Sequence, residues 1–480
     1  MNRLLPLLLI LLAIATHATS CEKPRKHADH EVGCLHEGLA TYTQKGRFGY
    51  VNKNGKIVIP VQYDSAEPFA HGRAIVSKRG SYGIINKRGK AVVPLFYDYA
   101  EGYQEGWAQV FQGRTVAFID YNGKKKLIIA NRCPSAFSDG LAQRGCYNYT
   151  RIYIDKKGDV PPGLEDIAAV HPFSDGKSLQ YRDKRYYFIG KNGKPVFAKD
   201  YEKAEPFSNG LAKVGENGKY GIIDTHGNEV IPLQYDDVFI LNNNLFRVKK
   251  DNKEGYIDRK NNIIIPIQYD SLSGDFSHEL VAAKTGKKHG YINRRNETII
   301  PFTYDSADPF FEYRTHKKTY VVAQVRLNNQ KTLIDTHGKP ILPWLDKIWE
   351  IEEGLIFFQN NEKYGFMNFE GKIIIPAEHD WSTGFSEGLV SLRKSGKDEK
   401  YGAFDVNGNV IIPFEYEEVF FFRGGLAEIK KNGKYGVIDK DNKVVIPIIY
   451  DKFEATYRGL FGARKDGEYF LLNHRNQELP

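Results

Sequence analysis

The side chains best suited to bind a metal lie close together near the N-terminus. His27, His30, Cys34 and His36 all fall within the stretch HADHEVGCLHEG. Imidazole nitrogen and thiolate sulfur are ligands for zinc and copper, so the spacing suits a small metal site. The same composition also suits a solvated tether in front of the folded region, since short His- and Cys-containing tracts occur in both settings. Apart from this candidate metal site, we expect no cofactor.

A second group of side chains with chemical potential lies in the segment 313–353. It contains Arg314, Trp344, Trp349 and Glu350. Acids beside aromatic rings suit the binding or cleavage of a sugar, and aromatic and Arg side chains dominate the binding energy of many protein interfaces. Two tryptophans at this spacing are also often packed in a core. We take these four residues as the candidate binding site and predict no catalytic residue.

The wider sequence gives no support for an enzyme or for a nucleic-acid-binding protein. It contains no His-Glu-x-x-His and no phosphate-binding glycine loop. Its 68 Lys and Arg against 59 Asp and Glu give a net charge of +9, with both signs interspersed along the chain. Binding to nucleic acid usually needs a clustered basic patch. We therefore expect a non-enzymatic protein with no nucleic-acid partner.

A repeated pattern must position these side chains. Gly-Leu-Ala-like openings recur 34 residues apart at Gly38, Gly72, Gly106 and Gly140, and the series resumes later in the chain. About thirteen such rows fill the sequence after its N-terminal segment. Self-similarity at this period is the mark of a tandem array.

Within a row the apolar residues alternate with period two, which indicates strands rather than helices. Three short strands are predicted in one regular row, at 211–214, 220–224 and 229–232. Asn-Gly pairs such as Asn54-Gly55 separate the second and third strands, and we expect a two-residue hairpin turn with positive φ at both positions. The proline that ends the third strand, Pro232 in this row, marks an edge.

A Tyr-Asp pair and then an aromatic residue follow the third strand in many rows. Examples are Tyr235-Asp236 for the pair, and Phe69, Phe207 and Phe310 for the later aromatic. Three short strands cannot bury a face alone, so we expect the aromatics to anchor one row on the next. The aspartates are expected to cap the turn.

These rows resemble the WG-repeat family, which is named for a Trp-Gly pair in the second strand followed by a hairpin and a proline. Here an aromatic-Gly pair takes that place, without the eponymous Trp. The pairs are Phe48-Gly49, Tyr82-Gly83, Tyr220-Gly221, Tyr364-Gly365, Tyr401-Gly402 and Tyr435-Gly436. The resemblance implies a bacterial repeat module without assigned activity, and it transfers no catalytic residue.

The predicted fold class is all-β: a continuous array of short three-stranded antiparallel units over residues 37–480, wound as an open β superhelix or solenoid. Propeller blades usually have four strands and 40 to 50 residues, so one or two propeller-like rings are the alternative. Two places depart most from the pattern, near 130–198 and 313–353. Such rows have either decayed or taken on another use.

The N-terminus resembles a signal peptide. A basic start and a short apolar stretch precede Ala18-Thr19-Ser20, so residues 1–20 are expected to be removed and 21–36 to form a tether. The new N-terminus, Cys21, lies in a partial lipobox and is a possible lipidation site. The protein would then be periplasmic, tethered to the outer membrane or secreted.

The four cysteines permit disulfides in an exported chain. Cys133 and Cys146 lie thirteen residues apart in one atypical row and are predicted to pair. Cys21 and Cys34 can pair only if Cys21 carries no lipid.

Together these features favour an exported, non-enzymatic binding or scaffolding protein of the bacterial envelope. Its expected partner is a protein, a peptide or a glycan, and it would contact a membrane only through a lipid on Cys21. The alternatives are an exported hydrolase acting on glycan or peptide, and a purely structural spacer.

Overall fold

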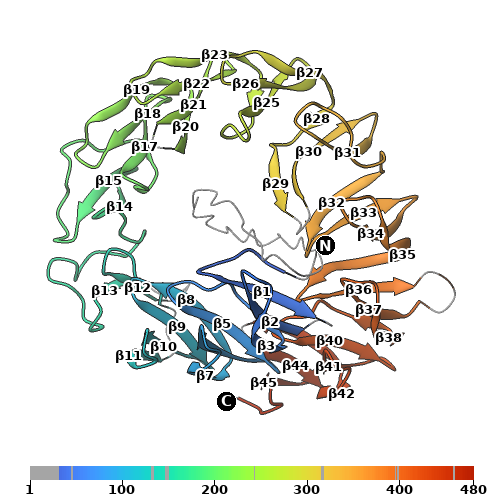
Figure 1. The fold of residues 1–480 in the computed structure, drawn as a ribbon. Helices are drawn as coiled ribbons and strands as arrows, with labels where there is room; N and C mark the ends of the chain where they lie inside the picture. The colour runs from blue at the N-terminus through green and yellow to red at the C-terminus, as the bar shows by residue number, and fades with distance from the viewer. Residues whose placement is uncertain are drawn as a thin grey trace.

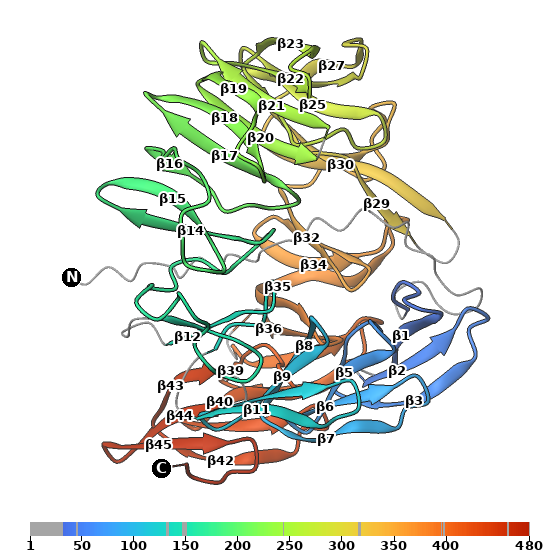
Figure 2. The same cartoon turned by 90° about the vertical axis from the view of Figure 1, so that its left-hand side faces the viewer.

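The computed structural model describes residues 32–44, 47–130, 134–145, 151–242, 244–314, 318–394, 396, 399–457 and 460–479. Its strands form twelve antiparallel sheets, of which the seven-stranded one spans two rows, so the described residues contain thirteen rows. The rows follow one another round a wide circle (Figure 1). The C-terminal rows come to lie beside the N-terminal rows at the same end of the molecule (Figure 2). The predicted all-β open repeat array is confirmed.

The strands are short and similar in length throughout the array. The first three rows contain β1 (Leu39–Gln44), β2 (Arg47–Asn52), β3 (Ile57–Tyr63), β4 (Ser65–Ala66), β5 (Arg73–Lys78), β6 (Ser81–Asn86), β7 (Ala91–Tyr97), β8 (Tyr99–Gln104), β9 (Trp107–Gln112), β10 (Thr115–Asp120) and β11 (Lys125–Ala130). The middle rows contain β12 (Ala142–Arg144), β13 (Ile152–Ile154), β14 (Lys177–Arg182), β15 (Arg185–Gly190), β16 (Lys203–Ala204), β17 (Leu211–Glu216), β18 (Lys219–Asp224), β19 (Glu229–Tyr235), β20 (Asp237–Asn242), β21 (Leu245–Lys250), β22 (Lys253–Asp258), β23 (Ile263–Tyr269), β24 (Ser271–Leu272), β25 (Leu280–Thr285), β26 (Lys288–Asn293), β27 (Thr298–Tyr304) and β28 (Ser306–Ala307). The remaining rows contain β29 (Phe311–Arg314), β30 (Thr319–Leu327), β31 (Gln330–Ile334), β32 (Lys347–Glu352), β33 (Leu355–Asn360), β34 (Lys363–Met367), β35 (Ile373–Ser386), β36 (Leu389–Lys394), β37 (Tyr401–Asp405), β38 (Val410–Tyr416), β39 (Glu418–Val419), β40 (Leu426–Lys431), β41 (Lys434–Asp439), β42 (Val444–Tyr450), β43 (Lys452–Tyr457), β44 (Leu460–Lys465) and β45 (Glu468–Asn473).

Most rows have one strand more than the three that the sequence pattern predicts. The segment after the Tyr-Asp pair forms a short strand on the edge of the next row, as β16 does against β17. The resulting order, β16-β17-β18-β19, is that of a four-stranded antiparallel sheet. Two rows in the segment near 130–198 are smaller, because β12 pairs only with β13 and β14 only with β15 among the described strands.

The two hairpins of a row have different turns, and the second differs from the turn predicted. The first hairpin has the two-residue loop with positive φ at both positions, as at Asn217 (φ 49°) and Gly218 (φ 70°). In the second hairpin only the glycine is left-handed, as at Gly55 (φ 77°), and Asn54 is not. The strand register shifts next to this turn, which is typical of a turn that ends in a glycine bulge. The prediction of positive φ at both Asn54 and Gly55 is therefore wrong.

The glycine after the aromatic residue is required by close backbone contact. A Cβ on Gly221 would lie 2.5 Å from the carbonyl oxygen of Ile231 and 2.9 Å from the amide nitrogen of Leu233. Both atoms belong to the neighbouring strand, β19. Only glycine fits where two strands approach so closely, which explains the second residue of the repeated pair.

The aspartate of the Tyr-Asp pair does cap a turn, as predicted. Asp236 accepts a hydrogen bond from the amide of Asp251 in the first hairpin of the next row (2.8 Å). It also forms an ion pair with Lys219, 17 residues earlier (2.6 Å). The same Lys-to-Asp spacing recurs in other rows. The other pairs are Lys253–Asp270, Lys288–Asp305, Lys363–Asp380 and Lys434–Asp451, with Arg47–Asp64 in the first row.

Aromatic side chains and carboxylates join each row to the next. Phe69 packs on Tyr50 of the preceding row with ring centroids 4.8 Å apart, and Phe310 packs on Tyr291 at the same distance. The acid in front of the row-opening glycine also accepts a hydrogen bond from the corresponding glycine amide one row later. These bonds run from Gly72 to Glu37, Gly140 to Glu105, Gly176 to Asp139, Gly210 to Asp175, Gly388 to Glu353 and Gly425 to Glu387. The predicted aromatic anchors between rows are thus confirmed.

Candidate functional site

The first and last rows touch along a surface that we call the seam. Several hydrogen bonds cross it between residues nearly the whole chain apart. They run from the Gly80 amide to the Gly424 carbonyl (2.9 Å), from Arg47 to Asp441 (2.7 Å), from Lys440 to the Asp64 carbonyl (2.7 Å) and from Arg475 to the Phe96 carbonyl (3.1 Å), and another joins Ser81 Oγ to His474 Nε2 (2.9 Å). No described strand of the first two rows pairs with a strand of the last two. The seam therefore consists of turns and side chains and not of a continuous sheet.

A buried lysine lies at the centre of the seam. The side chain of Lys440 is 1% exposed. Its ammonium group donates to the main-chain carbonyls of Asp64 and Glu387, and it lies 5.4 Å from the centroid of the Phe48 ring. Burial lowers the pKa of Lys440 to about 8, against the attraction of the Glu387 and Glu353 carboxylates. A lysine is buried so completely only where several acceptors surround it.

One row at the seam lacks the lysine of the Lys-to-Asp pair. Ser81 stands where the regular rows have the Lys or Arg of the Lys-to-Asp pair. The aspartate of that row, Asp98, instead faces Nδ1 of His474 at 3.5 Å. Asp98 has no lysine partner in its own row, and His474 of the last row takes that place.

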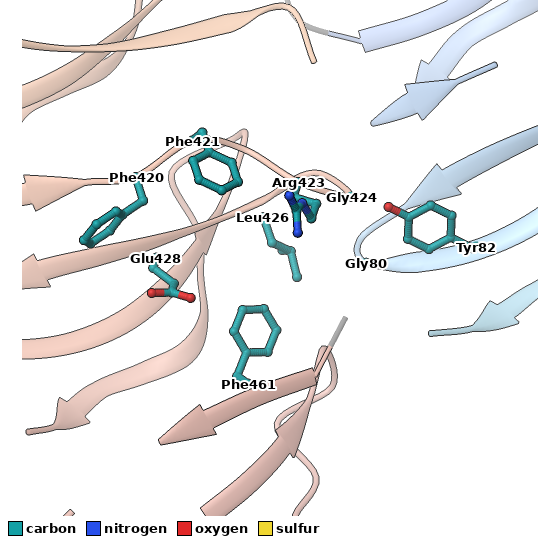
Figure 3. A pocket seen from close by; sticks show the side chains of 9 residues that line it. All are labelled: Gly80, Tyr82, Phe420, Phe421, Arg423, Gly424, Leu426, Glu428 and Phe461. Carbon is teal, nitrogen blue, oxygen red and sulfur yellow. The ribbon is translucent and has the colours of Figure 1, made fainter. Parts of the chain in front are cut away.

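A small apolar pocket opens on the seam (Figure 3). Its volume is about 110 Å³, and the rings of Tyr82, Phe420 and Phe461 line it together with Leu426. Tyr82 comes from the second row, whereas the other three come from the last rows. A cavity of this order holds one aromatic ring or one branched aliphatic side chain.

The mouth of the pocket carries an aromatic and a cationic side chain. Phe421 is 47% exposed, and the guanidinium of Arg423 lies 5.2 Å from the centroid of its ring. Both belong to the short loop between β39 and β40. The pocket can therefore take an apolar group while Arg423 meets a negative charge beside it.

A second, more polar cavity of about 380 Å³ lies on the same seam. Ser81 and His474 line it, together with Arg79, Lys443 and Arg475. The serine hydroxyl meets Nε2 of the imidazole, and Asp98 is next to Nδ1. The three side chains stand in the order of a Ser-His-Asp triad, but Nδ1 of His474 makes no hydrogen bond to Asp98.

The residues predicted from the sequence as a binding site lie in different surroundings. Trp344 packs against the core cluster that contains Tyr291. Trp349 lies in β32 with 49% of its surface exposed, beside the ring of Phe357 (6.2 Å). In the described part of the chain no ring contact joins the two tryptophans. Arg314 is the last residue of β29.

The acids of this segment also differ from one another. Glu350 is exposed, whereas Glu352 is half-buried and accepts a hydrogen bond from the amide of Phe385. Burial, and then the neighbouring Glu350 carboxyl, raise the pKa of Glu352 to about 8. Glu353 belongs to the row-to-row series and accepts from the amide of Gly388 (2.7 Å).

Most of the predicted metal and cysteine positions lie outside the described residues. These are His27, His30, Cys21, Cys133 and Cys146. Cys34 is described and is disulfide-bonded, so in this state its sulfur is not available to a metal as a thiolate. The amide and carbonyl of His36 bond to Leu39 at the start of the first row. Among the described residues, no group of three or more metal-binding side chains occurs.

Sequence reasoning missed the seam. Its partners are 376 residues apart for Lys440 and Asp64, and 394 apart for Arg47 and Asp441. A local signal was Ser81, because it stands in place of the Lys or Arg that pairs with an Asp 17 residues later in six other rows.

The fold is that of a tandem β-repeat protein whose end rows meet. The family model described as "WG containing repeat" matches ten segments of the chain. They are residues 48–81, 82–114, 188–220, 220–253, 255–288, 290–312, 332–364, 364–397, 401–435 and 435–469. The chain belongs to this family of WG-repeat proteins.

Other comparisons are more distant. No curated protein matches the chain in sequence. A crystal structure of the eukaryotic initiation factor is 10% identical over 64% of this chain and 96% of its own, with a TM-score of 0.32. The extracellular domain of a B. thetaiotaomicron protein is 8% identical over 96% of this chain and 78% of its own, with a TM-score of 0.21. At these scores neither likeness supports a conclusion about this chain.

One further finding concerns membranes. In the part of the chain that the structure describes, no helix is long and apolar enough to cross a bilayer.

Proposed function

We propose that this chain is an exported, non-enzymatic binding protein of the bacterial envelope, and that the seam pocket holds one apolar side chain of a peptide or protein partner. The pocket is the observation that carries the proposal. Its walls are mostly aromatic, with Leu426 and Glu428 beside the rings, and its volume of about 110 Å³ suits a single side chain rather than a whole cofactor. Export is supported by the predicted signal peptide at residues 1–20.

The chemistry of the mouth favours a particular kind of partner. An aromatic or leucine-like side chain would fill the space between Tyr82 and Phe461, and a neighbouring carboxylate would pair with Arg423. Exposed Phe421 would cover the inserted group from the side. Buried aromatic and Arg side chains are the usual anchors of such contacts.

A direct test uses N-acetyl-L-phenylalanine, which carries one ring and one carboxylate. Saturation-transfer NMR should detect its binding to the wild-type chain, and Phe421→Ala and Arg423→Ala should each weaken that binding. Tyr469→Ala is the matched control, because Tyr469 is 50% exposed and has Arg464 at 5.9 Å from its ring, outside the pocket. If Phe421→Ala and Arg423→Ala bind the probe like wild type, the pocket is not the site.

Hydrolysis is a second candidate function, favoured by the contacts of Ser81 with His474 and of His474 with Asp98. In such a reaction the serine oxygen attacks a carbonyl carbon, and the imidazole takes the proton and then passes it to the leaving group. Water then attacks the acyl-serine, which releases the acid and restores the serine hydroxyl. His474 is only 4% exposed, which fits a structural partner of Asp98 better than an exposed base. A fluorophosphonate probe decides between the two: covalent labelling at Ser81, absent in Ser81→Ala, would establish the hydrolase.

A further inference from the structure

We propose that the seam contacts form a clasp that assembles the binding pocket, so that contact between the end rows and binding of an apolar side chain are coupled. The coupling rests on the proposed function of the pocket, whereas the clasp itself does not. The first and last rows would separate as folded units when the clasp is broken.

The pocket needs both ends of the array. Gly80 and Tyr82 form one wall, and the residues of the β39–β44 region form the rest (Figure 3). The two sides are in close contact, because a Cβ on Gly80 would lie 2.5 Å from the Cβ of His474, and one on Gly424 would lie 3.2 Å from the Tyr82 hydroxyl. Separation of the end rows would remove the Tyr82 wall and leave an open surface.

The rows can separate without losing their own cores. The second row packs its apolar residues in clusters with its chain neighbours, and the last rows do the same. No strand ladder crosses the seam within the described residues. In repeat arrays each row gains most of its stability from itself and from its neighbours in sequence. Contact between the ends is therefore an added, local interaction.

Lys440 is the residue on which this contact most depends. Its ammonium group bonds to Asp64 on one side of the seam and to Glu387 on the other. It is far more buried than Asp441, whose side chain is 67% exposed in its ion pair with Arg47. Loss of the ammonium leaves the acceptors and the nearby Glu387 carboxylate buried without their cation, which is costly.

Coupling then follows from mass action. A ligand that binds only when the ends are in contact stabilises that contact, and a weaker clasp lowers the apparent affinity to the extent that it lowers the fraction of molecules with closed ends. The pocket would be available to a partner only in proportion to the fraction of molecules with closed ends.

The test compares Lys440→Met with Lys434→Met. The control removes a lysine from the neighbouring strand β41, where Lys434 pairs with Asp451 away from the seam. Three readouts are needed: circular dichroism for the folding of the rows, hydrogen exchange of the segment 79–82, and binding of N-acetyl-L-phenylalanine. The Gly80 amide is the reporter of the seam, because it donates its hydrogen bond across the seam to the Gly424 carbonyl.

We expect Lys440→Met to keep the β-sheet spectrum, to exchange faster at 79–82 and to bind the probe at least tenfold more weakly, with Lys434→Met unchanged. Unchanged exchange in Lys440→Met would overturn the clasp. Exchange at 79–82 as fast as in an unprotected chain, together with wild-type affinity, would overturn the coupling and leave the proposed function standing. If the wild type does not bind the probe, the proposed function and the coupling both fail, while exchange still decides the clasp. If Lys440→Met loses its β-sheet spectrum, the milder double variant Asp441→Ala, His474→Gln decides by the same criteria.

Discussion

Alanine at Gly221 should destabilise its row strongly. The new Cβ would lie 2.5 Å from the Ile231 carbonyl oxygen, where ordinary contact begins near 3.4 Å, an overlap of 3.4 − 2.5 = 0.9 Å. It would also meet backbone atoms of Pro232 and Leu233 at 2.9 Å. Because these are backbone atoms of a paired strand, no rotamer change relieves the overlap and β18 must move from β19. We expect a loss of about 3 kcal/mol, at the upper end of overpacking effects.

The assay is urea denaturation together with hydrogen exchange of residues 211–235. Gly221→Ala should lower the unfolding midpoint and speed exchange in β18 and β19. Gly102→Ala is the matched control, since its Cβ would meet nothing within 4 Å and Gly102 has no positive φ. It should be neutral or slightly stabilising, because alanine restricts the unfolded chain. Equal effects of the two substitutions would refute the steric reason for the aromatic-Gly pair.

Three further outcomes are expected. Trp344→Ala should lower the free energy of unfolding by about 2–3 kcal/mol because it empties part of a core, whereas Trp349→Ala should change it by less than about 1 kcal/mol in the same urea experiment. The pKa of Glu352 is raised in the folded chain to about 8, so its contribution to stability is fully present below pH 4.5 and is lost as pH rises to 8; Glu352→Gln should flatten the fall in melting temperature between pH 4.5 and pH 8. Tyr416→Phe removes the hydrogen bond to Asn442 of the next row (2.7 Å) and should cost about 1 kcal/mol in unfolding free energy.

The structure of a single row could largely be predicted from sequence, because its determinants are local. The alternation in 211–235, the proline and the aromatic-Gly pair each reflect contacts within one or two rows. The wrong prediction for the Asn54-Gly55 turn and the missed fourth strand also concern local structure, but they depend on the pairing geometry of the strands. Both Asn54-Gly55 and Asn217-Gly218 lie between strands, and only the strand register reveals which has positive φ at both positions. The additional short strand, such as β16, has only two residues, which is too few to show an alternation of apolar and polar residues.

The seam could not be predicted for a different reason. Whether Lys440 meets Asp64 depends on the curvature of the array, which is the sum of small rotations from row to row. No residue pair in the sequence encodes that sum. Lys440 follows β41 as Lys87 follows β6, and Lys87 also bonds to an acid of an earlier row, so the two positions look alike in sequence. Lys440 is buried because the first rows lie against it, and among the described residues Lys87 has no such neighbour at its position.

Small-angle X-ray scattering of the unmodified protein tests the central claim most directly, because it reports whether the end rows are in contact in solution. The account predicts a scattering curve that matches the structure with the first and last rows side by side (Figure 2). A larger maximum dimension, as expected for an array whose ends stand apart, would contradict both the seam and the pocket built on it.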